Sequence, residues 1–341
     1  MHFEAPFVIG EISANHLGSL QRAMELITVA KKTGVSCVKF QHLKPETITT
    51  RGSHPDLTVS SGSLWDGQSL WDLYSEAMMP WEWTEELVSH CNSLGLEWTS
   101  TPFDESAIDF LEQFSPRFYK IASFEIVDLP LIQYGASTGR PLIISTGMAT
   151  ISEIDAAVVA AENAGASSIT LLRTNSGYPA PINEMDLLAI PDMRKRWGYP
   201  VGLSDHTLGN VAALVSVGLG ATVFEKHFTL SRSDGGPDAE FSLEPKELEE
   251  YVQLLNNAQL SLGKARFGPS GAEKASIGFR PSLRAVKDIQ RGEVFTSENV
   301  KSVRPGGGLP PDQITELYGK TSSRKIPQGD PILETDLLSS I

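Results

Sequence analysis

Short apolar runs recur along the chain, separated by longer stretches in which apolar residues are spaced for a helix. Eight runs begin with mostly apolar residues and end in polar ones: FVIGEIS (7–13), CVKFQ (37–41), EWTSTPF (97–103), FYKIAS (118–123), PLIISTG (141–147), SITLLRT (168–174), PVGLSDH (200–206) and VFEKHF (223–228). Parallel strands that are covered on both faces have this composition. The runs therefore predict eight parallel strands.

Helical periodicity fills the segments between these runs. In 19–32, Leu20, Met24 and Ile27 recur at close to 3.6 residues per turn. Further helices are expected over 128–137, 152–163, 183–197 and 207–219. Eight strand–helix pairs within about 250 residues predict an α/β fold of the (β/α)8 TIM-barrel type. A doubly wound open sheet is the alternative, but no GxGxxG motif follows the first strand.

Two segments interrupt this alternation. Residues 42–80 form a long insertion after the second strand, rich in Ser, Gly, Asp and Trp, and loops of this length are often functional. Residues 263–280 have the composition of a linker, and after them the pattern changes to short strands and turns. We therefore expect a barrel domain over 1–262, a linker over 263–280 and a small β-rich domain over 281–341.

The net charge of −14 limits the partners of the chain. Long-range attraction to nucleic acid or to an anionic membrane is not expected at this charge. No apolar run reaches the roughly 18 residues of a membrane span, and the N-terminus lacks the pattern of a signal peptide. Cys37 and Cys91 form no CxxC motif, which suits a cytoplasmic location.

Two predicted strands that are neighbours in a barrel end in histidines, His206 and His227. The strand ends of a TIM barrel meet at one rim, where catalytic residues are found. Two imidazoles, together with water and substrate oxygens, suit a divalent ion such as Mn²⁺, Fe²⁺, Co²⁺ or Zn²⁺. Glu225 lies two residues before His227, on the same face of the strand. The alternative to a metal site is a pair of hydrogen-bonded structural histidines.

Two other strand ends carry lysines, Lys39 and Lys120. Inward-facing lysines are costly unless an anion meets them. Hydroxyl groups follow at neighbouring strand ends: Thr101, Ser123, Ser145, Ser176 and Ser204. The set predicts a site for a phosphate or carboxylate group. The alternative is that both lysines are solvated and bind no ligand.

Eight blocks of the sequence occur together in a known order: GEISANHLGS, CVKFQ, TSTPFD, FYKIAS, ISTGMAT, YPAP, VGLSDHTLG and FEKHFTL. They resemble the sialic acid synthase family over nearly the whole chain. The segments KDIQRGEVFTSENVKSVRPGGG and RKIPQGDPI resemble the antifreeze-like (SAF) domain that follows the barrel in that family. The resemblance implies an enzyme that condenses phosphoenolpyruvate with an N-acylated sugar to give a nine-carbon 2-keto acid.

The resemblance also implies roles for individual residues. His206 and His227 would hold a divalent metal ion, expected to be Mn²⁺ with Co²⁺ or Mg²⁺ as alternatives, and would act in catalysis with Glu11 and Glu225. Phosphoenolpyruvate would be held by Lys39, Lys120, Thr101, Ser123, Ser145, Ser176 and Ser204, and the sugar by Gln41, Tyr178 and Asp238. A homodimer is implied, in which the small domain of one chain covers the barrel of the other and its Arg304 meets the sugar.

Two segments indicate a branch of the family. RSDGGPDAEFSLEP (232–245) and SEAMMPWEW resemble pseudaminic acid synthases, which implies 2,4-diacetamido-2,4,6-trideoxy-L-altrose as the sugar. Ser176 stands where N-acetylneuraminate synthases usually carry asparagine. The alternatives are an N-acetylneuraminate or legionaminic acid synthase, a metal-dependent barrel aldolase or hydrolase that does not use phosphoenolpyruvate, and a non-catalytic sugar-binding protein.

Overall fold

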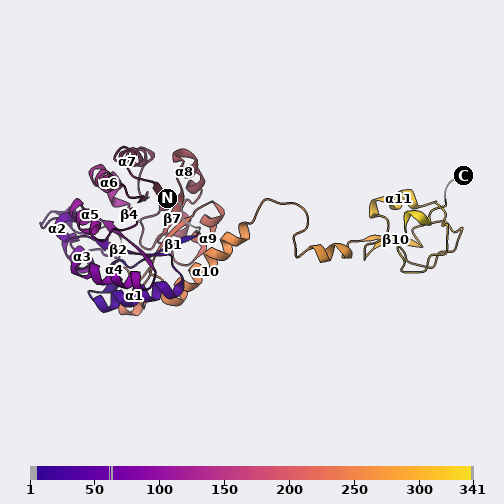
Figure 1. Ribbon diagram of the computed structural model, residues 1–341, viewed down its shortest axis with the longest axis horizontal. Helices are drawn as coiled ribbons and strands as arrows, with labels where there is room; N and C mark the ends of the chain where they lie inside the picture. The colour runs from indigo at the N-terminus through magenta and orange to yellow at the C-terminus, as the bar shows by residue number, and fades with distance from the viewer. Residues whose placement is uncertain (1–5, 61, 63, 339–341) are drawn as a thin grey trace. The chain divides into compact units, whose positions relative to one another are not determined.

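A closed barrel of parallel strands forms the first part of the chain in the computed structural model (Figure 1). The structure describes residues 6–60, 62 and 64–338, so the outermost residues of the domains expected over 1–262 and 281–341 lie outside it. Among the described residues the barrel strands are β1 (Phe7–Glu11), β2 (Cys37–His42), β3 (Glu97–Pro102), β4 (Tyr119–Ile121), β5 (Leu142–Ser145), β6 (Ile169–Thr174), β7 (Val201–Asp205) and β8 (Val223–His227). Each coincides with one of the eight apolar runs, and β8 pairs with β1 to close the barrel. The predicted (β/α)8 TIM barrel is confirmed.

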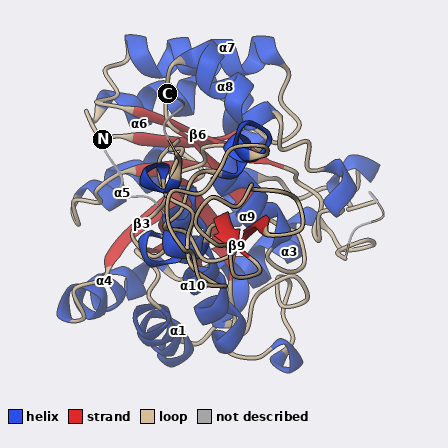
Figure 2. Cartoon of the chain, turned by 90° about the vertical axis from the view of Figure 1, so that its right-hand side faces the viewer, coloured by secondary structure: helices blue, strands red, loops and turns tan. Residues whose placement is uncertain are grey.

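Helices cover the outside of the barrel (Figure 2). Apart from α2 (Pro45–Ile48) and α3 (Leu70–Ala77), which belong to the insertion after β2, they are α1 (Leu20–Thr33), α4 (Thr84–Ser93), α5 (Glu105–Glu112), α6 (Leu129–Ser137), α7 (Ile151–Asn163), α8 (Ala189–Trp197), α9 (Val211–Gly218) and α10 (Pro245–Leu262). Their apolar faces share one buried core with outward-facing strand residues such as Val8, Val38 and Ile144. Because strand side chains alternate between faces, the remaining strand residues point into the barrel.

The inward-facing residues divide the barrel interior into an apolar and a polar part. Near the starts of the strands they form a separate buried apolar cluster: Phe7, Ile9, Cys37, Phe118, Ile143, Leu172 and Val223. Two residues further along several of the same strands, the inward positions become polar, as at Glu11, Lys39 and Lys120. The cluster therefore closes one end of the barrel and leaves the polar strand ends at the other.

The register of the strands brings these polar side chains to one level. Glu11 pairs with Lys39 of β2 and with His227 of β8. Ser204 of β7 pairs with Glu225 of β8. Glu225 and His227 share the inward face because they are two residues apart, whereas Lys226 between them points outward to the helices.

Two helices begin later than predicted. α8 starts at Ala189 rather than at 183, because the chain turns at Asp186, whose φ of 46° lies in the left-handed region. α9 starts at Val211 rather than at 207, because Thr207 is held by hydrogen bonds to Asp205 at the end of β7. Both segments before these helices become loops at the polar rim.

The contacts divide the chain into two compact units, with the boundary between Gly263 and Lys264. In the second unit, β9 (Ser282–Ala285) pairs antiparallel with β10 (Val300–Val303), and α11 (Ile314–Leu317) follows. This unit has its own apolar core: Leu283, Ala285, Ile289, Phe295, Val300, Leu317, Ile326 and Ile332. Within the described parts of both units, no helix has the length and apolar character needed to cross a membrane.

Candidate active site

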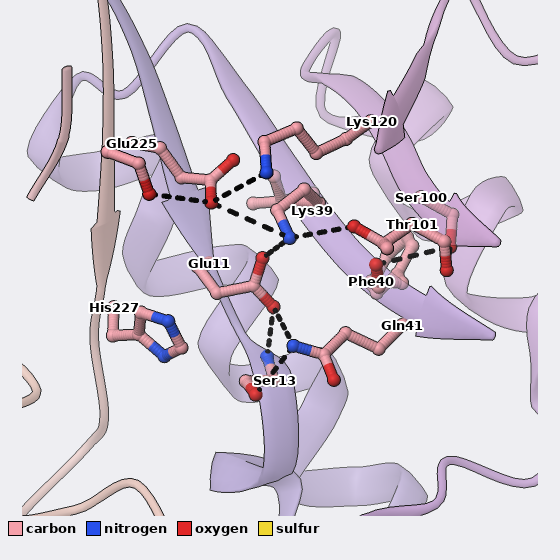
Figure 3. A network of polar contacts seen from close by, with 12 residues as sticks. Glu11, Ser13, Lys39, Phe40, Gln41, Ser100, Thr101, Lys120, Glu225 and His227 are labelled. Atoms are coloured by element: carbon pink, nitrogen blue, oxygen red, sulfur yellow. Dashed lines mark hydrogen bonds and ion pairs between the residues drawn. The ribbon is translucent and has the colours of Figure 1, made fainter. Parts of the chain in front are cut away.

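Four charged side chains from different strands share a buried space inside the barrel (Figure 3). Lys39 lies at the centre: its Nζ forms an ion pair with Glu11 and donates to Thr101 Oγ1 at 3.0 Å. Glu225 Oε1 lies 3.7 Å from Lys39 Nζ and 3.7 Å from Lys120 Nζ. None of the four charged residues is more than 4% exposed. Glu225 therefore bridges two lysines that water hardly reaches.

Burial and charge together set the protonation of this cluster. Burial raises the pKa of Glu11 to about 7, against the opposing charge of Lys39. Burial alone would also raise the pKa of Glu225, but the charges of Lys120 and Lys39 outweigh it and hold that pKa below its ordinary value. Burial lowers the pKa of Lys120 to about 8. The raised pKa of Glu11 means that the carboxylates offset the lysines less fully than two ordinary ionised glutamates would, which favours an anion beside the lysines.

Serine hydroxyls line the same cavity as the two lysines. Ser145 Oγ and Ser176 Oγ are buried without a hydrogen-bond partner among the described residues, and Ser123 Oγ accepts from Gly147 N at 3.2 Å. A Cβ at position 147 would overlap the hydroxyls of both Ser123 and Ser176. Gly147 thus lets these hydroxyls approach one another, and they suit the oxygens of a phosphate or carboxylate group.

His206 and His227 lie side by side, with ring centroids 5.5 Å apart. His206 Nδ1 lies 2.8 Å from the backbone oxygen of Asn175, so Nδ1 donates and Nε2 keeps its lone pair. His227 Nδ1 is buried without a hydrogen-bond partner among the described residues, and Asp238 Oδ2 lies 3.8 Å from it. Burial lowers the pKa of both histidines. Both imidazoles are therefore neutral, which is the form that binds a metal.

These two imidazoles fit a divalent ion as a partial set of ligands. Among the residues that the structure describes, no three or more His, Cys, Asp or Glu side chains form a cluster that could hold a metal. Water and substrate oxygens would have to complete the coordination, a donor set that suits Mn²⁺ and similar ions. The geometry accommodates the predicted metal, which stays a prediction.

The predicted site residues of the barrel line one cavity of 850 Å³: Lys39, Gln41, Thr101, Lys120, Ser123, Ser145, Ser176, Tyr178, Ser204, His206, Glu225, His227 and Asp238. Glu11 joins them through its ion pair with Lys39. Gln41 Nε2 donates to Ser13 Oγ at 2.9 Å, and the Tyr178 ring lies 4.3 Å from that of His206. Arg304 belongs to the second unit, where it is exposed. The structure thus places every barrel residue that was predicted for the site in this cavity or, for Glu11, directly beside it.

Glu125 is a cavity residue that sequence reasoning missed. It follows β4 in a short 3-10 turn, and its buried Oε2 has no hydrogen-bond partner among the described residues. Burial raises its pKa to about 7. The signal was present, because Glu125 lies two residues after Ser123 in FYKIASFE. It adds a second acid that can hold or release a proton near neutral pH.

The insertion forms a further wall of the cavity that sequence reasoning did not place. Its lining residues are mostly apolar: Ile48, Val59, Leu64, Trp65, Leu70, Leu73, Tyr74 and Ala77. Trp65 Nε1 donates to the backbone oxygen of Pro237 at 3.0 Å, and its ring lies 5.4 Å from that of Tyr178. The insertion therefore reaches the loop that follows β8 and encloses the polar rim from one side.

Comparison with known proteins gives two matches within the chain. Residues 26–267 match the NeuB family, and residues 280–338 match the SAF domain. The chain belongs to the NeuB family. The SAF match lies within the second unit, so the resemblance of this part of the chain to an antifreeze-like domain is confirmed.

Relatives within the NeuB family cover nearly the whole chain. The pseudaminic acid synthase of Campylobacter jejuni (strain 81-176) is 38% identical over 330 residues, 97% of this chain and 96% of the relative. That of Helicobacter pylori is 36% identical over 340 residues, 99% of each chain. The N,N'-diacetyllegionaminic acid synthase of Legionella pneumophila is 34% identical over 334 residues, 96% of this chain and 93% of the relative.

A solved structure is also similar to this chain in fold and sequence. The N-acetylneuraminic acid synthetase of Leptospira borgpetersenii has a TM-score of 0.71 at 28% identity, covering 80% of this chain and 90% of that one. The predicted family and class of enzyme, a phosphoenolpyruvate-dependent nonulosonic acid synthase, are confirmed. The roles of individual residues stay predictions.

The serine hydroxyls beside Gly147 give the first testable prediction. Gly147→Ala should raise the KM for phosphoenolpyruvate about tenfold or more, because the added methyl group displaces hydroxyls that would each donate a charge-assisted hydrogen bond. Steady-state phosphate release measures the effect. Gly218→Ala is the matched control, since nothing lies within 4 Å of the Cβ it would add at the exposed end of α9. A KM for Gly147→Ala equal to that of the control would contradict the anion site.

Proposed function

We propose that the protein condenses phosphoenolpyruvate with open-chain 2,4-diacetamido-2,4,6-trideoxy-L-altrose and water, giving pseudaminic acid and phosphate. The main support for this reaction is one cavity in which Lys39 and Lys120 adjoin two neutral histidines. The same cavity holds serine hydroxyls for which the described residues supply no hydrogen-bond partner. The relatives support the sugar, because the pseudaminic acid synthases are 36–38% identical to the chain and the legionaminic acid synthases 34%.

The lysines and hydroxyls bind the phosphoenolpyruvate. Lys39 and Lys120 hold its carboxylate and phosphate, with Thr101, Ser123, Ser145, Ser176 and Ser204 as further donors. Because the carboxylate and the phosphate are both held, C3 of the enol faces the sugar aldehyde in a fixed orientation. Much of the rate enhancement of a two-substrate condensation comes from such positioning.

The histidines and the remaining polar residues bind the sugar. His206 and His227 would hold Mn²⁺, with Co²⁺ or Mg²⁺ as alternatives, and the ion would supply Lewis-acid polarisation of the sugar aldehyde. Gln41, Tyr178 and Asp238 contact the hydroxyl and amide groups. The apolar wall around Trp65 adjoins these residues and suits the methyl groups of the sugar.

The chemistry then forms two bonds to the phosphoenolpyruvate, from C3 to the aldehyde carbon and from C2 to the water oxygen, and breaks the bond between C2 and the phosphate oxygen. C3 attacks the aldehyde carbon, the aldehyde oxygen takes up a proton, and the positive charge that develops at C2 is met by water. The water gives up two protons in all, which balance the one taken up by the aldehyde oxygen and the one that leaves with phosphate, and cleavage of the bond from C2 to the phosphate oxygen leaves the 2-keto acid. Glu225, held ionised by the two lysines, stabilises the charge at C2, and Glu11, with its raised pKa, transfers protons.

The same proposal includes a homodimer in which the second unit of one chain covers the barrel of the other. Arg304 is exposed, and no ion pair of it occurs among the described residues. An uncommitted guanidinium beside glycines suits contact with a polar substrate at a partner's cavity. The two unpaired cysteines and the use of phosphoenolpyruvate support action in the cytoplasm.

Substrate preference tests the proposed reaction. We expect phosphate release with phosphoenolpyruvate and the diacetamido-trideoxy-altrose, at a kcat/KM at least about tenfold above that with N-acetylmannosamine. A cavity that pairs with a second acetamido group loses those hydrogen bonds when a hydroxyl replaces it. The panel includes the 2,4-diacetamido-trideoxy-mannose that leads to legionaminic acid, and a higher kcat/KM with that sugar would replace the proposed product by legionaminic acid.

Removal of the metal tests the role of the two histidines. Exhaustive chelation should abolish phosphate release, and Mn²⁺ or Co²⁺ should restore it. His206→Ala and His227→Ala should lower kcat by about a hundredfold or more while the melting temperature changes little. His54→Ala is the matched control, since that side chain is 70% exposed. Full turnover after chelation would exclude the metal.

Mixed dimers test the placement of Arg304. Chains with Lys39→Ala and chains with Arg304→Ala are co-expressed with different tags, and dimers that carry both tags are purified. If the second unit acts on the other chain, one of the two sites is intact, and activity should return to about half of wild type. If each unit covers its own barrel, every site carries one lesion, and the mixed dimer will be no more active than the separate variants.

A further inference from the structure

Each of the two histidines follows a charged residue that points away from the cavity. Asp205 ends β7 and directly precedes His206, and Lys226 precedes His227 on β8. Because strand side chains alternate, Asp205 and Lys226 face the helices while the histidines face the barrel interior. The two charged residues are partners in the register of β7 and β8, and neither is more than 1% exposed.

Lys226 contacts the chain on both sides of His206. Its Nζ lies 3.1 Å from Asp205 Oδ2 and also donates to the backbone oxygen of Thr207. Asp205 Oδ1 in turn accepts from Thr207 N at 2.9 Å and from Thr207 Oγ1 at 2.7 Å. The residue before His206 and the residue after it are therefore both tied to the side chain next to His227.

The pair is also anchored from outside the barrel. Tyr251 of α10 donates to Asp205 Oδ2 at 3.5 Å, and the Tyr251 side chain is fully buried. A buried ion pair rarely stabilises a protein more than apolar residues of the same size would, since both charges lose their hydration. Stability alone therefore does not account for a charged pair at this point of the barrel.

We infer that Asp205 and Lys226 are positioning residues that fix His206 relative to His227, and so set the spacing of the two imidazoles. The inference rests on the proposed role of these histidines as metal ligands. Residues that do not bind a metal themselves but hold its ligands in position contribute strongly to metal affinity. Their loss typically weakens metal binding about 10- to 100-fold.

The test compares single and double variants of the full chain. Asp205→Asn and Lys226→Met each leave one buried charge unpaired and should lower the melting temperature. The double variant Asp205→Asn/Lys226→Met is neutral and should regain most of that loss. Its affinity for Mn²⁺, measured by electron paramagnetic resonance of the free ion, should nevertheless stay at least about tenfold below wild type.

Kinetics give a second readout that a purely structural role would not move. The double variant should show a kcat about tenfold or more below wild type, with the KM for phosphoenolpyruvate within about threefold, because Lys39 and Lys120 come from other strands. Glu112→Gln is the control: it breaks the ion pair with Arg140 on the outside of the barrel. It should lower the melting temperature without changing Mn²⁺ affinity or kcat.

A double variant with wild-type Mn²⁺ affinity and wild-type kcat would overturn the inference. Wild-type protein that binds no Mn²⁺ would contradict the metal proposal instead. In that case kcat and the KM for phosphoenolpyruvate of the double variant would test the positioning role without the metal. A lowered kcat with an unchanged KM supports the role, and an unchanged kcat overturns it.

Discussion

The cost of keeping charge away from water governs the arrangement of the site. Lys39 and Lys120 are buried, and an unpaired buried lysine would lose its proton or destabilise the fold. Glu225 lies between them and Glu11 contacts Lys39, which keeps both ammonium groups in place. Because burial also raises the pKa of Glu11, the two carboxylates compensate the lysines only in part. The remaining positive charge lies beside serine hydroxyls that have no hydrogen-bond partner in the described part of the chain, an arrangement that suits an anion.

This arrangement depends on the closure of the barrel. Glu11 is a register partner of residues on both β2 and β8, so one strand fixes the position of Lys39 on one side and of His227 on the other. On the outward face of β7 and β8, a second pair of charged residues, Asp205 and Lys226, is buried against α10. Alternation along β7 and β8 thus gives two polar layers, one lining the cavity and one buried against the helices.

Much of the barrel and of its polar rim could be predicted from the sequence, because strand ends in this fold meet at one place whatever the distance between them in the chain. His206 and His227 became neighbours for that reason alone. The pairing of charges could not be predicted, since it depends on side-chain distances: nothing in the sequence placed Glu225 between two lysines. Glu125 and Trp65 were missed because they lie in a turn and in an insertion. In such segments no regular spacing in the sequence indicates which way a side chain points. The late starts of α8 and α9 have the same cause, since single residues, Asp186 and Thr207, determine them.

The apolar cluster of Phe7, Ile9, Cys37, Phe118, Ile143, Leu172 and Val223 has a consequence for the kinetics of the enzyme. It fills the barrel near the starts of the strands, and the cavity lies at the strand ends. The lysines lie deep in this cavity, whereas Trp65 and Tyr178 belong to its more exposed wall. If the sugar binds against that wall, as proposed, it obstructs the path to the lysines. The proposed function therefore implies a compulsory order, in which phosphoenolpyruvate enters before the sugar.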